Sequence, residues 1–400
     1  MKLDYPAYDQ STYKIVKRVL KSGKVNYWTG NECKKFENEF SKYHRVKYSI
    51  TVSNGSVALE IALKALNLKN KDSVIVSPRS FIISASCVLN LGLKPIFADV
   101  DCNGNLSIEG IKKVYNKQVK AIIIVHLNGL ACDLDPILKF VKKNNIYLIE
   151  DCSQAHGAIY KGNKVGSFGD ISTWSFCQDK IISTGGEGGM ISTNNKKLWL
   201  KCWSLKDHGK NYNKKFNKKN KNIFNWLHDD LGSNYRMTEI QATIGRYQLK
   251  NLDNQIKRRN KVAMFYLRHL KDYFSKYKII KKPNFKCESC PLLHKTEACN
   301  NCRHAFYRLN LFFENNIKIN QTKIIRELLK FKVNCGVGPC PEIYREKVFK
   351  KLNHKPKKRL KNAKILGEKS LVFPINPFKS FLKLKRELNI IKKVLDKNIL

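Results

Sequence analysis

Apolar and polar positions alternate along the first 150 residues in a way that predicts strands and helices in turn. Short apolar runs predict strands at 48–53, 73–77, 94–99, 121–126 and 147–150. Segments with apolar residues at helical spacing predict helices at 31–46, 57–66, about 80–91, from 107, and 135–144. Because strands that alternate with helices form crossover units, we expect an α/β fold with a mainly parallel sheet covered on both faces. Such sheets bind ligands at the carboxyl ends of their strands.

The pattern changes beyond residue 200. Residues 206–222, KDHGKNYNKKFNKKNKN, are polar and show no hydrophobic period, which predicts a mobile loop. A helix is expected from Met237 to about Phe274. Helices near 320–331 and 383–397 and strands near 306–313 and 333–335 should follow. We therefore predict a large domain over 1–255 and a smaller C-terminal α+β domain over 256–400.

The net charge is strongly positive. The 400 residues contain 76 Lys and Arg against 32 Asp and Glu, giving +44, while 42% of residues are hydrophobic and can form a sizeable core. A basic surface can bind nucleic acid, but we find no recognised module and no basic stripe interleaved with aromatic residues. The lysines are spread along the chain beside many Asn and Ile, which favours a codon bias over a nucleic-acid partner. The charge would also suit an anionic substrate.

The start of the chain, MKLDYPAYDQ, has no apolar signal core. No run approaches the roughly 18 apolar residues needed to cross a bilayer, so we expect a cytoplasmic protein with no membrane partner. In that compartment the 13 cysteines are expected to be free thiols or metal ligands rather than disulfides.

A carboxylate and a lysine suit chemistry with pyridoxal 5'-phosphate (PLP). Asp151 ends the predicted strand YLIED, and Lys180 follows shortly before the glycine-rich turn at 184–189. A PLP enzyme needs an acid against the pyridine nitrogen, because the protonated ring accepts electrons from the substrate. It also needs a lysine whose amine forms a Schiff base. Taken singly, each residue fits a structural role equally well.

Two further segments should lie at the same edge of the sheet. The turn Asn54-Gly55-Ser56-Val57 joins a strand to a helix and offers N–H groups, a hydroxyl and the positive end of a helix dipole to a phosphate. An ordinary helix cap would use the same residues. Phe81 opens the next helix, where its ring can stack on a flat cofactor or pack in the core.

Many ordered motifs resemble the DegT/StrS-type sugar aminotransferases, which have the type I fold of PLP-dependent aminotransferases. The likeness covers essentially the whole chain. It includes SGKVNYWTG (22–30), SNGSVALEIALKAL (53–66), SPRSFIISA (77–85), IEDCSQAHGA (149–158), GSFGDISTWSFCQDKIISTGGEGGMISTN (166–194), KDHGK (206–210), GSNYRMTEIQATIGRYQL (232–249) and HAFYRLNLFF (304–313).

The resemblance implies roles for individual residues. Lys180 would bear the cofactor and shuttle protons, and Asp151 would pair with the pyridinium nitrogen. The remaining cofactor contacts implied are those of Gly55, Ser56, Val57 and Ser175 with the phosphate, Phe81 stacked on the ring, and Gln154 facing the ring or its phenolic oxygen. Asn234 would reach the phosphate of a neighbouring subunit, which implies a homodimer with shared active sites. His156 and Arg236 also lie in matching motifs, where structural roles fit equally well.

The activity implied is transfer of an amino group from an amino acid, with glutamate the expected donor, to the keto group of a nucleotide-linked sugar. The product would serve aminodeoxy-sugar synthesis for surface polysaccharide or lipopolysaccharide. Some family members have His at the lysine position and run a dehydration, and Lys180 argues against that branch. Two alternatives stay open, a PLP-dependent lyase or dehydratase acting on a nucleotide sugar and a non-catalytic regulatory homologue.

An insertion at 283–303 lies outside the common family pattern and carries two CxxC units. Its cysteines are Cys287, Cys290, Cys299 and Cys302. Four thiolates can close around one tetrahedral zinc ion, so we predict a structural zinc site. A reduced loop is the main alternative, and an iron–sulfur cluster is a less favoured third.

Overall fold

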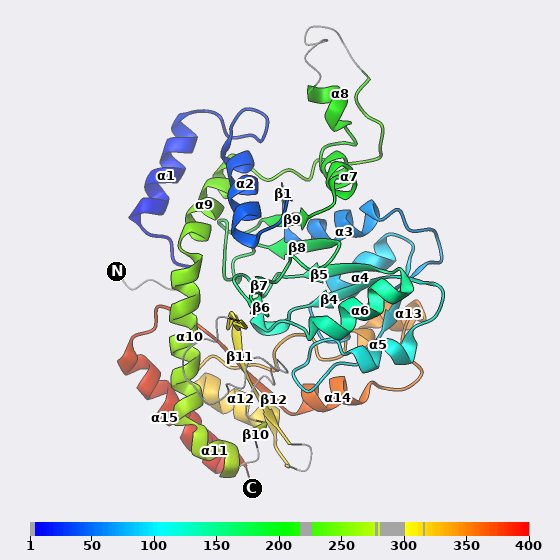
Figure 1. The fold of residues 1–400 in the computed structure, drawn as a ribbon. Helices are drawn as coiled ribbons and strands as arrows, with labels where there is room; N and C mark the ends of the chain where they lie inside the picture. The colour runs from blue at the N-terminus through cyan, green and yellow to red at the C-terminus, as the bar shows by residue number, and fades with distance from the viewer. Residues whose placement is uncertain (1–4, 217–225, 277–278, 281–300, 315–316, 400) are drawn as a thin grey trace.

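The computed structural model describes residues 5–216, 226–276, 279–280, 301–314 and 317–399 (Figure 1). Its centre is a seven-stranded sheet with the order β1-β9-β8-β5-β4-β2-β3. The strands are β1 (Tyr48–Val52), β2 (Ser73–Val76), β3 (Lys94–Phe97), β4 (Val119–Val125), β5 (Tyr147–Asp151), β8 (Ile171–Ser175) and β9 (Gly189–Thr193). Only β9 of these seven runs antiparallel to its neighbours, so the other six strands end at one edge.

Helices cover both faces of this sheet, and the predicted α/β class is confirmed. Successive strand residues point to opposite faces, so Ile123 and Ile149 belong to one hydrophobic core while Ile122 and Leu148 belong to another. The first face packs against α3 (Gly55–Ala65), α4 (Ile83–Asn90) and α7 (Lys196–Lys206). The second packs against α2 (Glu32–His44), α5 (Ile108–Val114), α6 (Leu134–Asn144) and α9 (Glu239–Lys250).

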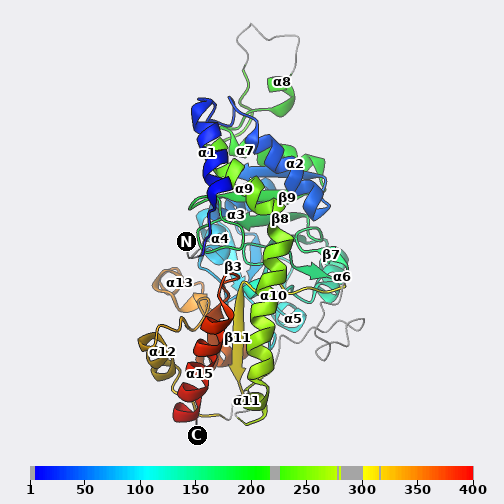
Figure 2. The same cartoon turned by 90° about the vertical axis from the view of Figure 1, so that its left-hand side faces the viewer.

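The C-terminal part forms a second core around a small antiparallel sheet. Its strands are β10 (Ile279–Ile280), β11 (Arg308–Phe313) and β12 (Ser370–Pro374). The long helices around it are α10 (Leu252–His269), α12 (Gln321–Lys330) and α15 (Phe381–Asn398), and the shorter ones are α11 (Lys271–Lys276), α13 (Lys347–Lys351) and α14 (Lys361–Glu368). Figure 2 shows α10 and α15 side by side, flanking β11.

The predicted division near residue 256 falls inside α10. Leu252 and Ile256 belong to a core under the large sheet, whereas Val262 and Tyr266 belong to the C-terminal core. One helix therefore contributes to both cores, and the division into two domains stays a prediction.

Three predicted elements differ in the structure. The single helix from Met237 to Phe274 is broken into α9, α10 and α11, with Asn251 in a non-helical conformation between the first two. The predicted strand at 333–335 is wrong, because pairing there is reduced to one isolated bridge between Gly336 and Val372. In the polar segment 206–222, Tyr212–Phe216 form the short helix α8, because Tyr212 packs 4.9 Å from the ring of Trp203. Residues 217–225 lie outside the described ranges.

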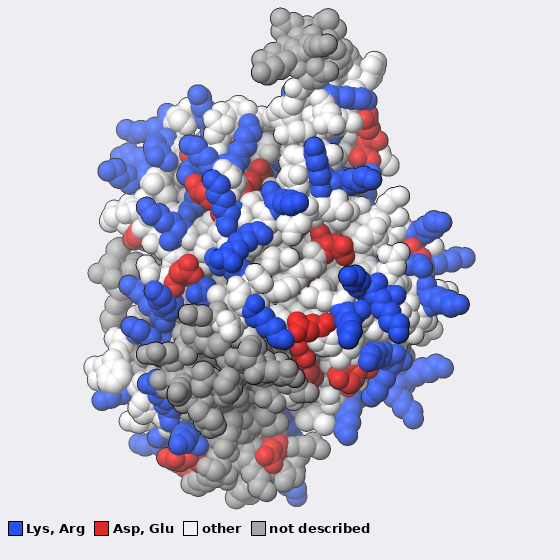
Figure 3. Space-filling model, viewed as in Figure 1, with Lys and Arg blue, Asp and Glu red and all other residues white. Residues whose placement is uncertain are grey.

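Lysine and arginine side chains are spread over the face drawn in Figure 3, with acidic side chains scattered among them. On this face they do not gather into one stripe, in line with the sequence analysis. No helix in the described ranges is long and apolar enough to cross a membrane.

Candidate active site

The predicted site residues come from segments that end at one edge of the large sheet. Asp151 is the last residue of β5, Ser175 is the last residue of β8, and Gly55 begins α3 just after β1. Lys180 lies in the loop that connects β8 to β9. Since β1, β5 and β8 run in the same direction, their carboxyl ends bring these residues to one side of the sheet.

The turn between β1 and α3 is shaped to receive an anion. Asn54 caps the helix by accepting a hydrogen bond from the Val57 amide at 2.9 Å. The first N–H groups of a helix, here those of Gly55 and Ser56, have no helical partner and carry the positive end of the dipole. A Cβ added to Gly55 would lie 2.5 Å from the Cβ of Ser175, so only glycine lets the turn approach β8 this closely. These residues fit a phosphate group.

Asp151 is buried, with 4% of its surface exposed. Its carboxylate accepts hydrogen bonds from the Ser153 amide at 3.1 Å and the Ser84 hydroxyl at 3.4 Å. Burial raises the pKa of Asp151, and the opposing influences include hydrogen bonds from Ser153 and the positive charge of Lys180. A buried carboxylate with so few donors can accept another, and a protonated pyridine nitrogen is a donor of that kind.

The amine of Lys180 lies between an acid and a phenol. Its Nζ is 2.9 Å from Oδ1 of Asp179 and 3.4 Å from the hydroxyl of Tyr307, which precedes β11. Tyr307 in turn donates a hydrogen bond to Asp179. Burial works to lower the pKa of the Lys180 amine, but Tyr307 and Asp179 outweigh it and raise that pKa above its usual value. In the protein without cofactor, these two groups therefore favour the protonated amine.

The loop that carries Lys180 is fixed at both ends by main-chain hydrogen bonds. The Phe176 amide donates to the Gly188 carbonyl at 2.8 Å, and the Gln178 amide donates to the Gly186 carbonyl at 2.9 Å. Gly186 has a φ of +127°, a conformation that other residues rarely adopt. The glycine-rich segment after Lys180 therefore closes the loop back onto β8.

Three other predicted cofactor residues, Phe81, Gln154 and Asn234, differ in exposure and in their hydrogen bonds. Phe81 just before α4 is 66% exposed, which leaves its ring free to stack on a ligand. The Gln154 side-chain oxygen accepts a hydrogen bond from the Asn128 amide at 2.8 Å, which fixes its orientation. Asn234 is exposed, and the next residue, Tyr235, accepts a hydrogen bond from the Ser53 amide at 2.9 Å. Asn234 thus adjoins a residue that contacts Ser53, just before the Asn54 turn of the same chain, and its action across a subunit boundary stays a prediction.

His156 and Arg236 have structural surroundings. The His156 ring is buried against Trp174 and Phe176, with centroid distances of 5.4 and 5.6 Å. Burial lowers its pKa to about 3, so the ring is neutral. Arg236 forms an ion pair with the buried Asp207 at 2.7 Å.

Sequence reasoning missed Tyr307, Asp179 and Ser84 as site residues. Tyr307 lies in the HAFYRLNLFF motif and Asp179 directly precedes Lys180, so both stood in recognised segments without an assigned role. The contact between Tyr307 and Lys180 joins residues 127 positions apart, which no local pattern reveals. Ser84 lies one turn of chain beyond Phe81, and only packing of α4 on the sheet brings it to Asp151.

The predicted zinc ligands Cys287, Cys290 and Cys299 lie outside the described residues. Cys302 is buried and accepts a hydrogen bond from the Lys161 amide at 3.3 Å. Within the described ranges, His126, Glu150 and Cys152 have ligand atoms within 4.8 Å of one another. Main-chain amides already donate to both oxygens of Glu150, so this trio reads as a hydrogen-bond network.

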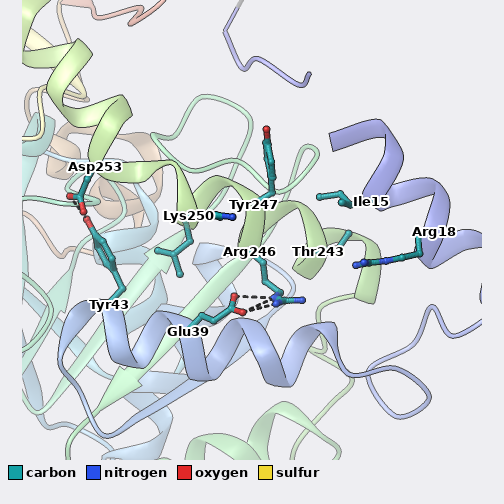
Figure 4. A pocket seen from close by; sticks show the side chains of 10 residues that line it. Ile15, Arg18, Glu39, Tyr43, Thr243, Arg246, Tyr247, Lys250 and Asp253 are labelled. Atoms are coloured by element: carbon teal, nitrogen blue, oxygen red, sulfur yellow. Dashed lines mark hydrogen bonds and ion pairs between the residues drawn. The ribbon is translucent and has the colours of Figure 1, made fainter. Parts of the chain in front are cut away.

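A hollow of about 500 Å³ opens between α1 (Gln10–Lys21), α2, α9 and α10 (Figure 4). On its polar wall, Arg246 forms an ion pair with Glu39 (Figure 4) and another with Glu32. None of the predicted site residues lines it. The candidate active-site residues therefore lie at the edge of the sheet and not in this hollow.

Comparison with known proteins decides the family. The sequence model of the DegT/DnrJ/EryC1/StrS aminotransferase family matches residues 6–386. The chain belongs to this family. It is 42% identical over 242 residues to a GDP-perosamine synthase of Escherichia coli O157:H7, a match that covers 60% of this chain and 64% of that protein.

Two more family relatives extend the likeness. A dTDP-3-amino-3,6-dideoxy-alpha-D-galactopyranose transaminase of Aneurinibacillus thermoaerophilus is 37% identical over 67% of this chain and 70% of that protein. The crystal structure of an aminotransferase from Psychrobacter cryohalolentis superposes with a TM-score of 0.92 at 41% identity and covers 99% of both chains. The fold predicted from the sequence, that of PLP-dependent type I aminotransferases, is confirmed.

Proposed function

We propose that this family member is a PLP-dependent aminotransferase that moves an amino group from an amino acid to the keto group of a nucleotide-linked sugar. The observation that carries the proposal is the meeting of Lys180, Asp151 and the Gly55 turn at one edge of the sheet. When bound, PLP supplies a carbonyl for amines and a ring that accepts electrons. Retention of Lys180 and Asp151 counts against a dehydratase and against a non-catalytic homologue.

In this proposal Lys180 both binds PLP and moves protons, and each other residue has one task. Lys180 Nζ takes up and returns the proton at the reacting carbon, and Asp179 and Tyr307 hold that amine when it is free. Asp151 keeps the ring nitrogen protonated. A wider set binds the cofactor without moving protons: Gly55, Ser56, Val57 and Ser175 at the phosphate, and Phe81 and Gln154 at the ring.

The substrate class rests on the relatives and on charge. Both curated relatives named above carry nucleotide-sugar products or substrates in their names. A nucleoside diphosphate sugar is an anion, which suits a chain with a net charge of +44. We propose glutamate as the amino donor and aminodeoxy-sugar synthesis for surface polysaccharide as the purpose.

Replacement of Lys180 with Ala tests the assignment. The variant should lose the absorbance of lysine-bound PLP and all turnover with glutamate and a keto-sugar nucleotide, while remaining folded. Lys113→Ala, which removes an exposed lysine on α5, is the matched control and should behave as wild type. Turnover at the wild-type rate in Lys180→Ala would refute the proposal.

A homodimer with shared sites is part of the proposal and has its own test. Lys180→Ala and Asn234→Ala are mixed under conditions that exchange subunits. If Asn234 acts across the interface, one site of each mixed dimer carries both defects and the other carries neither, so activity should partly return. No recovery after proven exchange would assign Asn234 to the site of its own subunit, beside Ser53.

We also propose that the four cysteines bind one structural zinc ion. Four thiolates leave no open coordination position, so the ion would stabilise the 283–303 insertion without entering the chemistry. Elemental analysis of protein purified without chelators should find about one zinc per chain. Substoichiometric metal after zinc supplementation would contradict this.

A further inference from the structure

The N-terminal segment, residues 5–9, lies against the loop that carries Lys180. The Tyr5 hydroxyl donates a hydrogen bond to the main-chain carbonyl of Lys180. The Tyr8 hydroxyl lies 2.9 Å from the hydroxyl of Ser183 and accepts a hydrogen bond from the Gly185 amide at 3.1 Å. Two tyrosines therefore contact three positions of a loop that is 175 to 177 residues away in the sequence.

The segment is itself anchored on its other side. Asp9 accepts a hydrogen bond from the hydroxyl of Tyr247 on α9 at 2.5 Å, and its side chain also caps α1. The carbonyl of Ala7 accepts a hydrogen bond from the Gln248 amide group at 3.5 Å. Because α9 packs against the large sheet, residues 5–9 form a tie between a fixed helix and the lysine loop.

Tyr5 also meets a buried cation. The guanidinium carbon of Arg259 lies 4.7 Å from the centroid of the Tyr5 ring, and Arg259 is 1% exposed. Its NH1 donates to the carbonyls of Ile375 at 2.7 Å and Phe306 at 3.4 Å. Among the described residues its Nε and its second terminal nitrogen have no hydrogen-bond partner. The ring of Tyr5 therefore lies within cation–π distance of this buried charge.

These contacts hold Lys180 at both of its ends. The Lys180 carbonyl accepts a hydrogen bond from Tyr5, and the ring of Tyr5 packs on Arg259. The Lys180 amine contacts Tyr307, and Arg259 also binds the carbonyl of the preceding residue, Phe306. Burial raises the pKa of Tyr5 to about 12, so its hydroxyl stays a donor throughout the neutral range. The main chain of Lys180 and the position of its amine are thus coupled through one buried network.

We propose that Tyr5 and Tyr8 are positioning residues that hold the lysine loop by its main chain, so that retention of PLP depends on the N-terminal segment. The proposal rests on Lys180 being the residue that binds PLP. Neither tyrosine has a part in proton transfer. Their loss should loosen the loop without removing any group that touches the reacting atoms.

The test compares Tyr5→Phe and Tyr8→Phe with Tyr13→Phe, which removes the hydroxyl of a half-exposed tyrosine on α1. Amide hydrogen exchange is measured over residues 178–185 in the cofactor-free protein. In the holoenzyme, the rate of PLP loss is followed by absorbance after dilution. Each site variant should raise both rates roughly three- to tenfold, as expected for one buried hydrogen bond, while Tyr13→Phe leaves both unchanged.

Exchange and PLP loss at the wild-type rates in both site variants would overturn the proposal. Equal acceleration in Tyr13→Phe would do the same, because it would show a general loss of stability. Hydrogen exchange in the cofactor-free protein does not depend on which lysine binds PLP. A failed proposed function, seen as intact turnover in Lys180→Ala, is therefore distinguishable from a failed positioning role.

Discussion

Glu150 and Asp151 are neighbours on β5, yet they face two very different regions of the molecule. Glu150 points to the face covered by α5 and α6, where His126 and the amides of Gly166, Phe168 and Gly169 all donate hydrogen bonds to its carboxylate. Asp151 points to the opposite face, toward α4, and receives hydrogen bonds from Ser153 and Ser84. Glu150 therefore has donors at both of its oxygens, whereas Asp151 can still accept a further hydrogen bond.

The two environments shift the pKa values of the two acids in opposite directions. Burial works to raise the pKa of Glu150, but the hydrogen bonds from His126 and the glycine amides outweigh it and hold that pKa below its usual value. Burial raises the pKa of Asp151, and its donors do not compensate. Buried acids without enough donors gather at functional sites, so the missing donors of Asp151 mark it as the candidate, while the full set around Glu150 indicates a structural role.

The largest expected effect comes from Asp151→Asn. Turnover should fall by about three orders of magnitude, or about 4 kcal/mol of activation free energy, because the ring nitrogen of PLP would lose its acidic partner. The cofactor-free protein should be no less stable at neutral pH. Since the folded pKa of Asp151 is raised, its ionised form opposes folding above that pKa. Steady-state rates measure the loss of turnover, and thermal unfolding measures the stability. Near-normal turnover would show that Asp151 is no more functional than Glu150.

Glu150→Gln should lower stability, the property that Asp151→Asn should leave intact. We expect a loss of about 2–4 kcal/mol in the free energy of unfolding at neutral pH, because buried donors lose their charged acceptor. The lowered pKa of Glu150 contributes stability that is present above its unfolded pKa and is lost as pH falls through the folded value. The gap between wild type and variant should therefore narrow in acid. Denaturant titrations at several pH values measure it, and a gap that widens in acid would contradict the assignment.

The smallest effect is expected from Ser84→Ala. The hydrogen bond from Ser84 to Asp151 is long, at 3.4 Å, and it adds to a carboxylate that PLP is proposed to satisfy. Turnover should change less than about fivefold, which corresponds to about 1 kcal/mol. A loss as large as that of Asp151→Asn would mean that Ser84 orients the carboxylate and that Asp151 has no capacity to spare.

Strands β1 to β5 of the large sheet were predicted, because strands and helices alternate there with clear periods, whereas β8 and β9 were not. The predicted ends of β1 and β5, at residues 53 and 150, lie within one residue of the observed ends at Val52 and Asp151. The break at Asn251 was not predictable, since the apolar period continues through it and only packing into two cores separates α9 from α10. Tyr5 and Tyr307 were missed for a related reason, because their partner Lys180 is far away along the chain.

The length of the connection between β8 and β9 helps to determine where Lys180 lies. Its two strands are adjacent in the sheet and paired in register, so the number of residues between Ser175 and Gly189 determines where Lys180 stands. An inserted or deleted residue cannot be absorbed by sliding, because either end would lose its place in the sheet. A residue inserted or deleted between Ser175 and Lys180 would therefore change the distance from the end of β8 to the lysine amine, even with every side chain of the site retained.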